Sequence, residues 1–328
     1  MIDFTGRRAD GPNDLADGPI FQRATGWLIE IGAKDVLPAV EMGVRFMHVG
    51  DTAAVWSTSK YAYGPGRRKS DSGSKDEDLL PHSNVRYDIS LLRIVEMSDP
   101  AAQLQLCQSR KAIGNDIYRF ECIQDDEYAK SRALSLYQRA AQTLAELVQK
   151  KDDTVAAEAT KALMDCLNNI AAVHLSCKSF HAAKQACVRV LEMDPNNATA
   201  LTRAAKAALE DSASSYEEVD AAIAAADDVG ADTSKLKRLL QQRRAAHAKQ
   251  TKKMFSSMAK GMIQQKKSDT STAGEAEQPS EEHGISDQFQ TDVSTSYASF
   301  FVLAMVAILA LALAVWMLTA RGPNVPDF

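Results

Sequence analysis

The chain has 328 residues, of which 45% are hydrophobic and 25% charged, and its formal net charge is −5. This composition allows a buried core and more than one domain, and it excludes a largely disordered chain. The net negative charge gives no case for a nucleic-acid partner.

Residues 1–97 show strand-like alternation, turns that contain glycine, and one polar insert, RRKSDSGSKDED. This pattern predicts a small antiparallel β domain. A short helix is expected within DVLPAVEMGV, the run that begins at Asp35, and a strand follows it.

Residues 101–230 are rich in Ala and Leu with a 3.6-residue period, which predicts helices. The motif LNNIAAVHL at Leu167 recurs as LTRAAKAAL at Leu201, an offset that matches the period of the tetratricopeptide repeat (TPR). Three helix pairs are therefore expected to stack into a superhelix, with Phe180 and Tyr216 beginning second helices and KAIGNDIY (111–118) opening the first repeat. A generic helical bundle is the alternative.

Residues 231–267 predict a basic helical extension. From Lys235 to Lys267 there are eleven Lys or Arg and no Asp or Glu. Apolar residues recur at helical spacing among them: Leu236, Leu239, Leu240, Met254, Phe255, Met258 and Met262. Such a helix can bind calmodulin or lie on anionic lipid, or it can cap the last repeat, and both alternatives can hold for different parts.

The remaining segments predict a membrane anchor. Residues 268–296 are polar and read as a flexible linker. Within 297–320, the nineteen uncharged residues Phe300 to Leu318 are long enough to span a bilayer as a helix. Residues 321–328 would form a short lumenal or intermembrane tail, so we expect a single-pass, tail-anchored and cytosol-facing protein of the mitochondrial outer membrane or the endoplasmic reticulum.

The five cysteines and six histidines show no CxxC, no HExxH and no spacing typical of a catalytic triad. We therefore expect no metal and no cofactor. The odd number of cysteines, with no signal peptide in the sequence, predicts free thiols in a reducing compartment.

Two motifs resemble a known family. VGDTAAVWSTSKYAYGPG and LPHSNVRYDISLLRI are similar to the second half of an FK506-binding-protein (FKBP) domain. With three repeats and an anchor, the order of segments resembles the membrane-anchored immunophilins of that family. The resemblance implies an α+β, FKBP-like antiparallel sheet with a short helix, followed by an all-α TPR superhelix and one transmembrane helix. Family domains place a strand ahead of IDFTG, so either the sequence is truncated before Met1 or the sheet lacks an edge strand.

In this family the pocket receives a proline-containing segment and catalyses peptidyl-prolyl isomerisation through its shape and apolar lining. The resemblance implies the lining Phe4, Phe21, Trp27, Val36, Leu37, Tyr63 and Tyr87. The Tyr63 hydroxyl and the Leu37 N–H would bind substrate carbonyls. The alternative is that the aromatic residues are ordinary core residues of a β domain.

Three positions depart from the family pattern. Val40 stands where the pocket floor has Trp, Gln22 stands where an Asp is usual, and a charged loop, 67–78, replaces an apolar flap. A large-to-small change of this kind costs about 2–4 kcal/mol of contact energy. We therefore expect weak or absent isomerase activity, which Trp at Val40 would raise.

The family's repeats also bind C-terminal acidic peptides of Hsp90 or Hsp70 through a carboxylate clamp. The matching residues here are Lys111, Asn115, Asn169 and Arg203, and Thr199 stands where a Lys is usual. The resemblance implies a membrane-tethered co-chaperone or adaptor that also engages client proteins. The alternatives are an active isomerase that the repeats deliver to membranes, and a receptor for newly made membrane proteins.

Overall fold

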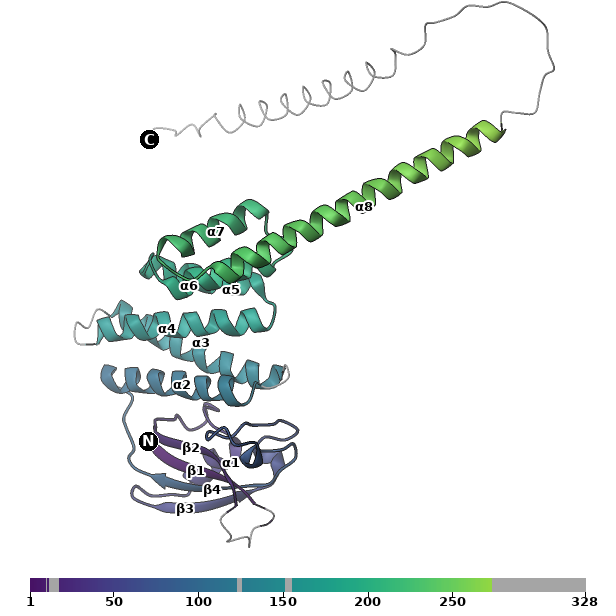
Figure 1. Cartoon of the computed structure of the whole chain (residues 1–328). Helices are drawn as coiled ribbons and strands as arrows, with labels where there is room; N and C mark the ends of the chain where they lie inside the picture. Colours follow the sequence, from purple (N-terminus) through teal and green to yellow (C-terminus); the bar gives the residue numbers. More distant parts are fainter. Residues whose placement is uncertain (10, 12–17, 123–125, 151–154, 273–328) are drawn as a thin grey trace, which may run out of the picture. The chain divides into compact units, whose positions relative to one another are not determined.

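The computed structural model describes residues 1–9, 11, 18–122, 126–150 and 155–272, of which 262–272 are described by their backbone alone. Two compact units are distinguished, Met1–Lys253 and Met254–Phe328. The first unit contains a sheet domain and a series of helix pairs (Figure 1).

The N-terminal domain is a four-stranded antiparallel sheet of order β2-β1-β4-β3. Its elements are β1 (Ile2–Arg8), β2 (Ile20–Trp27), α1 (Pro38–Val44), β3 (Thr52–Ser57), the 3-10 turns η1 (Ser59–Tyr61) and η2 (Lys75–Glu77), and β4 (Val85–Leu91). Alternate residues of β1 and β4 are buried, because successive side chains of a strand point to opposite faces. Strand β1, for which no preceding strand exists in the described chain, is an interior strand that pairs with β2 and β4.

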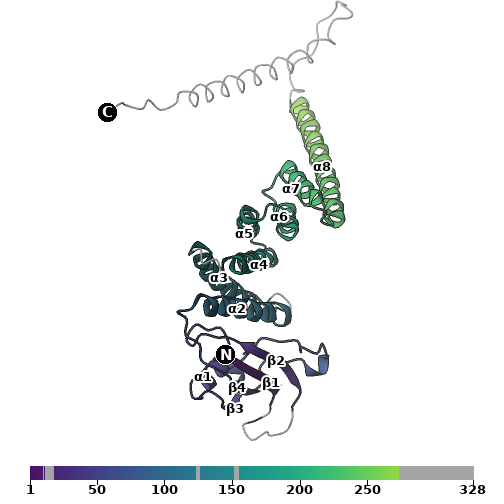
Figure 2. The ribbon, with the colours of Figure 1, turned by 90° about the vertical axis from the view of Figure 1, so that its left-hand side faces the viewer.

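The helical region follows in three antiparallel pairs and a long last helix (Figures 1 and 2). The helices are α2 (Pro100–Phe120), α3 (Glu127–Gln149), α4 (Ala156–Ser176), α5 (Phe180–Met193), α6 (Ala198–Glu210), α7 (Tyr216–Asp228) and α8 (Ser234–Thr272). Helices α5 and α7 begin at Phe180 and Tyr216, the residues that the sequence pattern indicated.

Two helix boundaries differ from the sequence prediction. The KAIGNDIY motif lies in the second half of α2, because α2 begins earlier, at Pro100, where Asp99 caps the first turn and a proline at the first helical position needs no N–H partner. Helix α8 continues to Thr272, five residues beyond the predicted end of the basic helix at 267.

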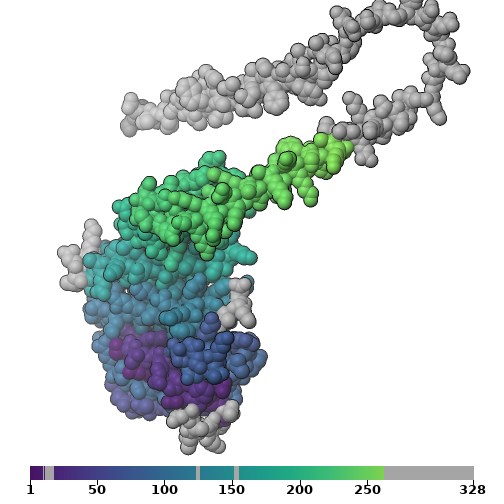
Figure 3. Space-filling view, in the orientation of Figure 1, coloured from purple at the N-terminus to yellow at the C-terminus, as the bar shows by residue number. Residues whose placement is uncertain are grey.

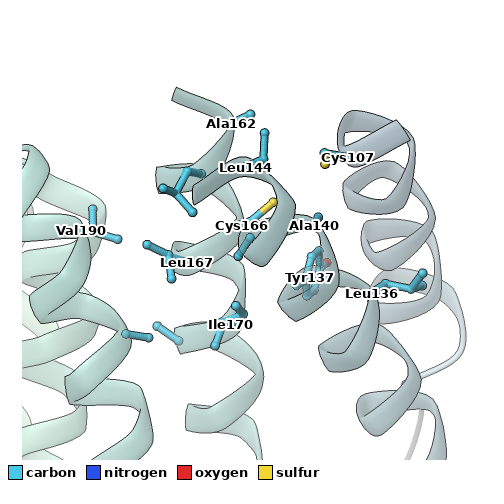
Figure 4. Packing of buried hydrophobic residues seen from close by; sticks show 14 of the residues in the cluster. Cys107, Leu136, Tyr137, Ala140, Leu144, Ala162, Cys166, Leu167, Ile170 and Val190 are labelled. Atoms are coloured by element: carbon cyan, nitrogen blue, oxygen red, sulfur yellow. The ribbon is translucent and has the colours of Figure 1, made fainter. Parts of the chain in front are cut away.

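The helices bury one continuous core from α2 to α6 (Figure 4). Small residues such as Ala140 and Ala162 let neighbouring helices approach, and larger side chains such as Tyr137, Leu144 and Leu167 fill the space between them. Each helix pair buries its apolar side chains against the next pair.

The predicted anchor and tail, 297–320 and 321–328, and all of the linker after Thr272 lie outside the described residues. Among the helices that the structure does describe, none is both long enough and apolar enough to cross a bilayer.

The tight contact between α2 and α3 gives a test of the helical core. A methyl group added at Gly114 would lie 2.7 Å from the ring of the buried Tyr137. Gly to Ala usually stabilises a helix interior by up to about 1 kcal/mol, but overpacking costs about 1–3 kcal/mol. We expect Gly114→Ala to lower the free energy of unfolding in urea, followed by circular dichroism.

The matched control is Gly261→Ala in the exposed part of α8, where an added methyl group meets no atom within 4 Å. This change should leave stability unchanged or raise it. A Gly114→Ala protein as stable as the control would contradict the packing described here.

Candidate functional site

The predicted aromatic residues of the sheet domain come together around one cavity. Its lining includes six of the seven predicted side chains and also Val40: Phe4, Trp27, Val36, Leu37, Val40, Tyr63 and Tyr87. Phe21 lies behind this lining and meets Tyr63 and Tyr87 edge-to-face, with ring centroids 5.7 and 6.2 Å apart. Phe4 meets Trp27 and Tyr87 in the same manner at 5.2 and 5.6 Å. Such edge-to-face pairs fix the ring positions.

The other side of the cavity comes from the helical region. Ile113, Asp116 and Glu121 near the C-terminal half of α2, and Arg132 on α3, complete the lining. The cavity that remains has a volume of about 20 Å³, close to the space that one water molecule requires. A prolyl ring does not fit in this volume, so helices α2 and α3 close the pocket of the sheet domain.

The hydroxyl of Tyr63, predicted to bind a substrate carbonyl, is occupied within the protein. It donates to Gln22 Oε1 at 2.9 Å, and Gln22 Nε2 donates to Asp116 Oδ2 of α2 at 3.0 Å. Burial raises the pKa of Tyr63, so the hydroxyl stays protonated as a donor. Gln22 therefore links the Tyr63 hydroxyl to the closing helix.

The strongest contact across this junction is made by Arg68, in the loop predicted to be a polar flap. Its side chain is fully buried and pairs bidentately with Asp116, at 2.8 and 2.9 Å. It also contacts Asp71 at 2.7 Å and Glu121 at 3.6 Å. Burial raises the pKa of both Asp116 and Glu121, while the Arg68 charge acts in the opposite direction.

A second set of contacts fixes the N-terminal half of α2. Arg110 of α2 binds Asp35 at 3.1 Å and Glu30 at 2.5 Å. Arg139 of α3 binds the same Asp35 at 2.9 Å, and the Leu28 N–H donates to Ser109 Oγ at 2.8 Å. These contacts hold the closing helix to the sheet domain from Ser109 to Glu121. In the space-filling view the purple and blue sheet domain adjoins the teal helical region (Figure 3).

The predicted role of Val40 changes with this geometry. Val40 is buried and lines the closed cavity together with the indole of Trp27 and with Ile113. Val40 is smaller than the Trp that is usual in the family, but no large open space remains beside it. A Trp at this position would overpack a cavity of about 20 Å³. Closure by α2, rather than a thinned floor alone, limits access to this pocket.

Three of the five predicted clamp residues form one cluster on the repeats. Asn169 of α4 donates to Asn115 Oδ1 of α2 at 2.9 Å, and the Tyr137 hydroxyl donates to the same oxygen at 2.8 Å. These two donors fix the amide so that Asn115 Nδ2 is the group that can donate to a ligand. Lys111 lies one turn away but pairs with Asp165 of α4 at 2.8 Å.

The other two predicted clamp residues lie on α6. Thr199 is exposed in the first turn of that helix. Arg203 is partly buried, and its Nη1 donates to the carbonyl oxygen of Asn168 at 2.5 Å. Burial lowers the pKa of Arg203, and no carboxylate pairs with it within the ranges that the structure describes.

Sequence reasoning missed the residues that close the pocket. Arg68 lies in a charged insert that looks solvated, and Asp116 has the appearance of an ordinary surface residue of a helix. The only signal was the helical spacing of Ile113 and Asp116, which places them on the side of α2 opposite Lys111 and Asn115. In the described part of the chain no three His, Cys, Asp or Glu side chains converge as a metal site requires.

Comparisons with known proteins agree with this architecture. Residues 1–92 match the family model of the FKBP-type peptidyl-prolyl cis-trans isomerases. These residues form an FKBP-type domain. The helical, TPR-like region that follows it closes the pocket of this FKBP domain.

Two curated relatives are similar over a longer stretch. FK506-binding protein 5 of Rhizopus delemar is 24% identical over 189 residues, 57% of this chain and 45% of that protein. FK506-binding protein 59 of Drosophila melanogaster is 24% identical over 172 residues, 51% of this chain and 35% of that protein. The chain spans less than half the length of the curated relatives it matches.

Two solved structures are also similar. A multi-domain immunophilin from Arabidopsis thaliana has a TM-score of 0.35 and 18% identity, covering 69% of this chain and 85% of that one. The C-terminal TPR-containing domain of a Plasmodium falciparum FK506-binding protein has a TM-score of 0.40 and 16% identity, covering 47% of this chain and 97% of that one.

The buried charge at Arg68 gives a test of the closed junction. Arg68→Met should lower the free energy of unfolding by about 3–5 kcal/mol, because the largely buried Asp116 would lose its bidentate guanidinium partner. Urea unfolding of the full chain measures the change. The neighbouring Arg67 is exposed, so Arg67→Met is the matched control and should have almost no effect. Equal effects of the two substitutions would show that Arg68 does not hold the junction.

Proposed function

We propose that this protein is an FKBP–TPR immunophilin that acts as a peptide-binding adaptor or co-chaperone, with weak or absent isomerase activity. Its repeats would hold the C-terminal carboxylate of an Hsp90- or Hsp70-type chaperone, and its FKBP domain would contribute to contacts with client proteins. The observation that supports this function best is Arg203, which has no carboxylate partner in the described part of the chain and donates to the carbonyl oxygen of Asn168, next to Asn169 of the amide cluster.

A partly buried cation without a carboxylate partner is poorly solvated. Burial lowers the pKa of Arg203, which means that its charged form is disfavoured where it lies. A carboxylate from a ligand would supply charge-assisted hydrogen bonds and remove this penalty. The amide groups of Asn115 and Asn169 would donate to the same ligand, which suits the terminal carboxylate of a peptide.

The carboxylate of Asp165 should reduce the affinity of this candidate clamp for anions. Asp165 lies one turn before Asn169 on α4 and already neutralises Lys111. A carboxylate ligand must compete with Asp165 for the Lys111 ammonium. Thr199 supplies no charge at the position where a Lys is usual, so Arg203 would carry most of the attraction.

The competing function is an active prolyl isomerase that the repeats deliver to its substrates. The aromatic lining, with Phe4, Trp27, Tyr63 and Tyr87 around one cavity, favours it. Against it, catalysis requires the amide to enter an apolar pocket in its twisted form, and here Ile113 and Asp116 of α2 line a cavity of only about 20 Å³. The adaptor function therefore ranks first.

We also propose that the protein is anchored in a membrane. Residues 297–320 would anchor the protein in the mitochondrial outer membrane or the endoplasmic reticulum with the described domains in the cytosol. The uncharged run from Phe300 to Leu318 supports this part of the proposal. The basic segment 235–267 is in addition a candidate calmodulin site by its charge and spacing.

The clamp is tested by calorimetry with two versions of an acidic peptide, one with a free C-terminal carboxylate and one amidated. We expect binding of the free acid only. Arg203→Gln should weaken binding at least tenfold, and Asn169→Ala should weaken it as well, because each removes a donor to the carboxylate. Arg189→Gln, an exposed arginine on α5, is the matched control and should bind as the wild type does.

Asp165→Asn provides a test of opposite sign. Loss of this carboxylate frees the Lys111 ammonium, so affinity for the free acid should rise several-fold. Equal affinity for the acid and the amidated peptide, or unchanged affinity in Arg203→Gln, would reject the clamp.

The closed pocket is tested by prolyl isomerisation of a model peptide with the full chain. We expect little turnover, and Ile113→Ala should raise it several-fold because the cavity then opens toward α2. Ile117→Ala removes the same atoms from the same helix but lines no part of the cavity, so it should not raise turnover. High turnover by the unaltered chain would favour the isomerase function instead.

A further inference from the structure

Helix α8 begins as a cover for the last repeat. Leu236 and Leu240 are buried against α6 and α7, in one cluster with Leu209, Val219 and Ile223. Arg243 donates to the carbonyl oxygens of Leu209 and Asp211, at 2.7 and 3.1 Å. The ring of His247 meets Tyr216 with centroids 5.9 Å apart. This part of the helix therefore serves as a structural cap.

The same apolar stripe continues along α8 into the second unit, where it is exposed. With 3.6 residues per turn, Met254 lies on the side of the helix that carries Leu236, and Met258 on the side that carries Leu240. Met254, Phe255 and Met258 are 52%, 61% and 57% exposed, whereas Leu236 and Leu240 are 7% and 5% exposed. These three residues form an apolar face that nothing in the described chain covers.

The opposite side of this segment is cationic. Lys249, Lys252 and Lys260 are exposed, and their spacing places each of them roughly 120° or more around the axis from Met254. No Asp or Glu occurs between Lys235 and Lys267, although the whole chain has a net charge of −5. The segment therefore contains no acidic residue that could neutralise its positive charge along the helix itself.

From this arrangement we propose that the segment Lys249–Lys260 of α8 lies on an anionic lipid surface. Met254, Phe255 and Met258 enter the boundary between headgroups and acyl chains, while the lysines bind anionic headgroups. Each lysine near such a surface contributes attraction that falls off within a Debye length. This proposal is independent of the carboxylate clamp and of isomerase activity.

Two observations favour lipid over a protein partner. The exposed apolar face is small, with three side chains within about one and a half turns, and a lipid surface accepts such a shallow face without a shaped groove. The uncharged run from Phe300 to Leu318 would add a second contact with the same bilayer. Two linked contacts bind more tightly than either one alone, because the second is intramolecular.

The test uses the full chain with vesicles of phosphatidylcholine, alone or mixed with phosphatidylserine, and follows amide hydrogen exchange by mass spectrometry. Exchange in residues 249–260 should slow at least tenfold on the anionic vesicles and much less on the neutral ones. This readout is local, so a contact made by residues 300–318 cannot imitate it. Raising the salt concentration should reduce the protection.

Two variants separate the two faces. Replacing Met254, Phe255 and Met258 together by Ser should abolish protection on both vesicle types. Replacing Lys249, Lys252 and Lys260 together by Gln should remove the difference between anionic and neutral vesicles. Unchanged exchange in α2–α7 shows that each variant is folded. The matched controls are Leu239→Ser, earlier in the same helix, and Lys161→Gln on α4, and both should behave as the wild type does.

Equal exchange on the two vesicle types would overturn the proposal. Protection of residues 249–260 by calcium-loaded calmodulin but not by anionic vesicles would also overturn it, and would assign the helix to a protein partner.

Discussion

The described structure depends on one buried cation. Arg68 belongs to the FKBP domain, but two of its carboxylate partners, Asp116 and Glu121, belong to α2 and its C-terminus. A guanidinium cannot be buried without such partners, and burying Asp116 likewise requires a cation. Within each part Asp71 also pairs with Arg68 and Arg132 with Glu121, but the bidentate pair of Arg68 with Asp116 joins the FKBP domain to the first helix pair.

Helix α2 connects the two candidate binding sites. On one of its faces Lys111 and Asn115 pair with Asp165 and Asn169 of α4, and on the opposite face Ile113 and Asp116 line the FKBP pocket. A rigid helix cannot move one face without the other. The candidate clamp and the closed pocket therefore share a structural element, although their ligands would differ in chemistry.

Closure of the FKBP pocket by α2 affects the pocket and the candidate clamp differently, because the two sites need different chemistry. Prolyl isomerisation needs no nucleophile but requires an apolar volume large enough for a twisted amide, and the cavity between the FKBP domain and α2 has a volume of only about 20 Å³. Holding a carboxylate requires only directed donors, and Asn115, Asn169 and Arg203 are the candidate donors on the repeats. The exposed end of α8 adds a third candidate surface, which is cationic and apolar.

Local patterns in the sequence determined the type and order of the elements. The alternation in 1–97, the 34-residue repeat and the helix starts at Phe180 and Tyr216 follow from periodicity, which reports which side of an element faces a core. The aromatic residues of the pocket could be named because short motifs that resemble the family carry them. The spacing in α8 left covering and exposed parts as alternatives, and the structure buries Leu236 and Leu240 while it exposes Met254 and Met258.

Only the tertiary structure decided whether those sites are open. Arg68 and Asp116 are 48 residues apart, and nothing local distinguishes a buried charged pair from two solvated surface residues. The volume of the pocket depends on Ile113, which belongs to a different domain, and the charge of Lys111 depends on Asp165, on another helix. Periodicity shows which face of a helix is buried, but the residues that meet there are set by packing between elements far apart in the sequence.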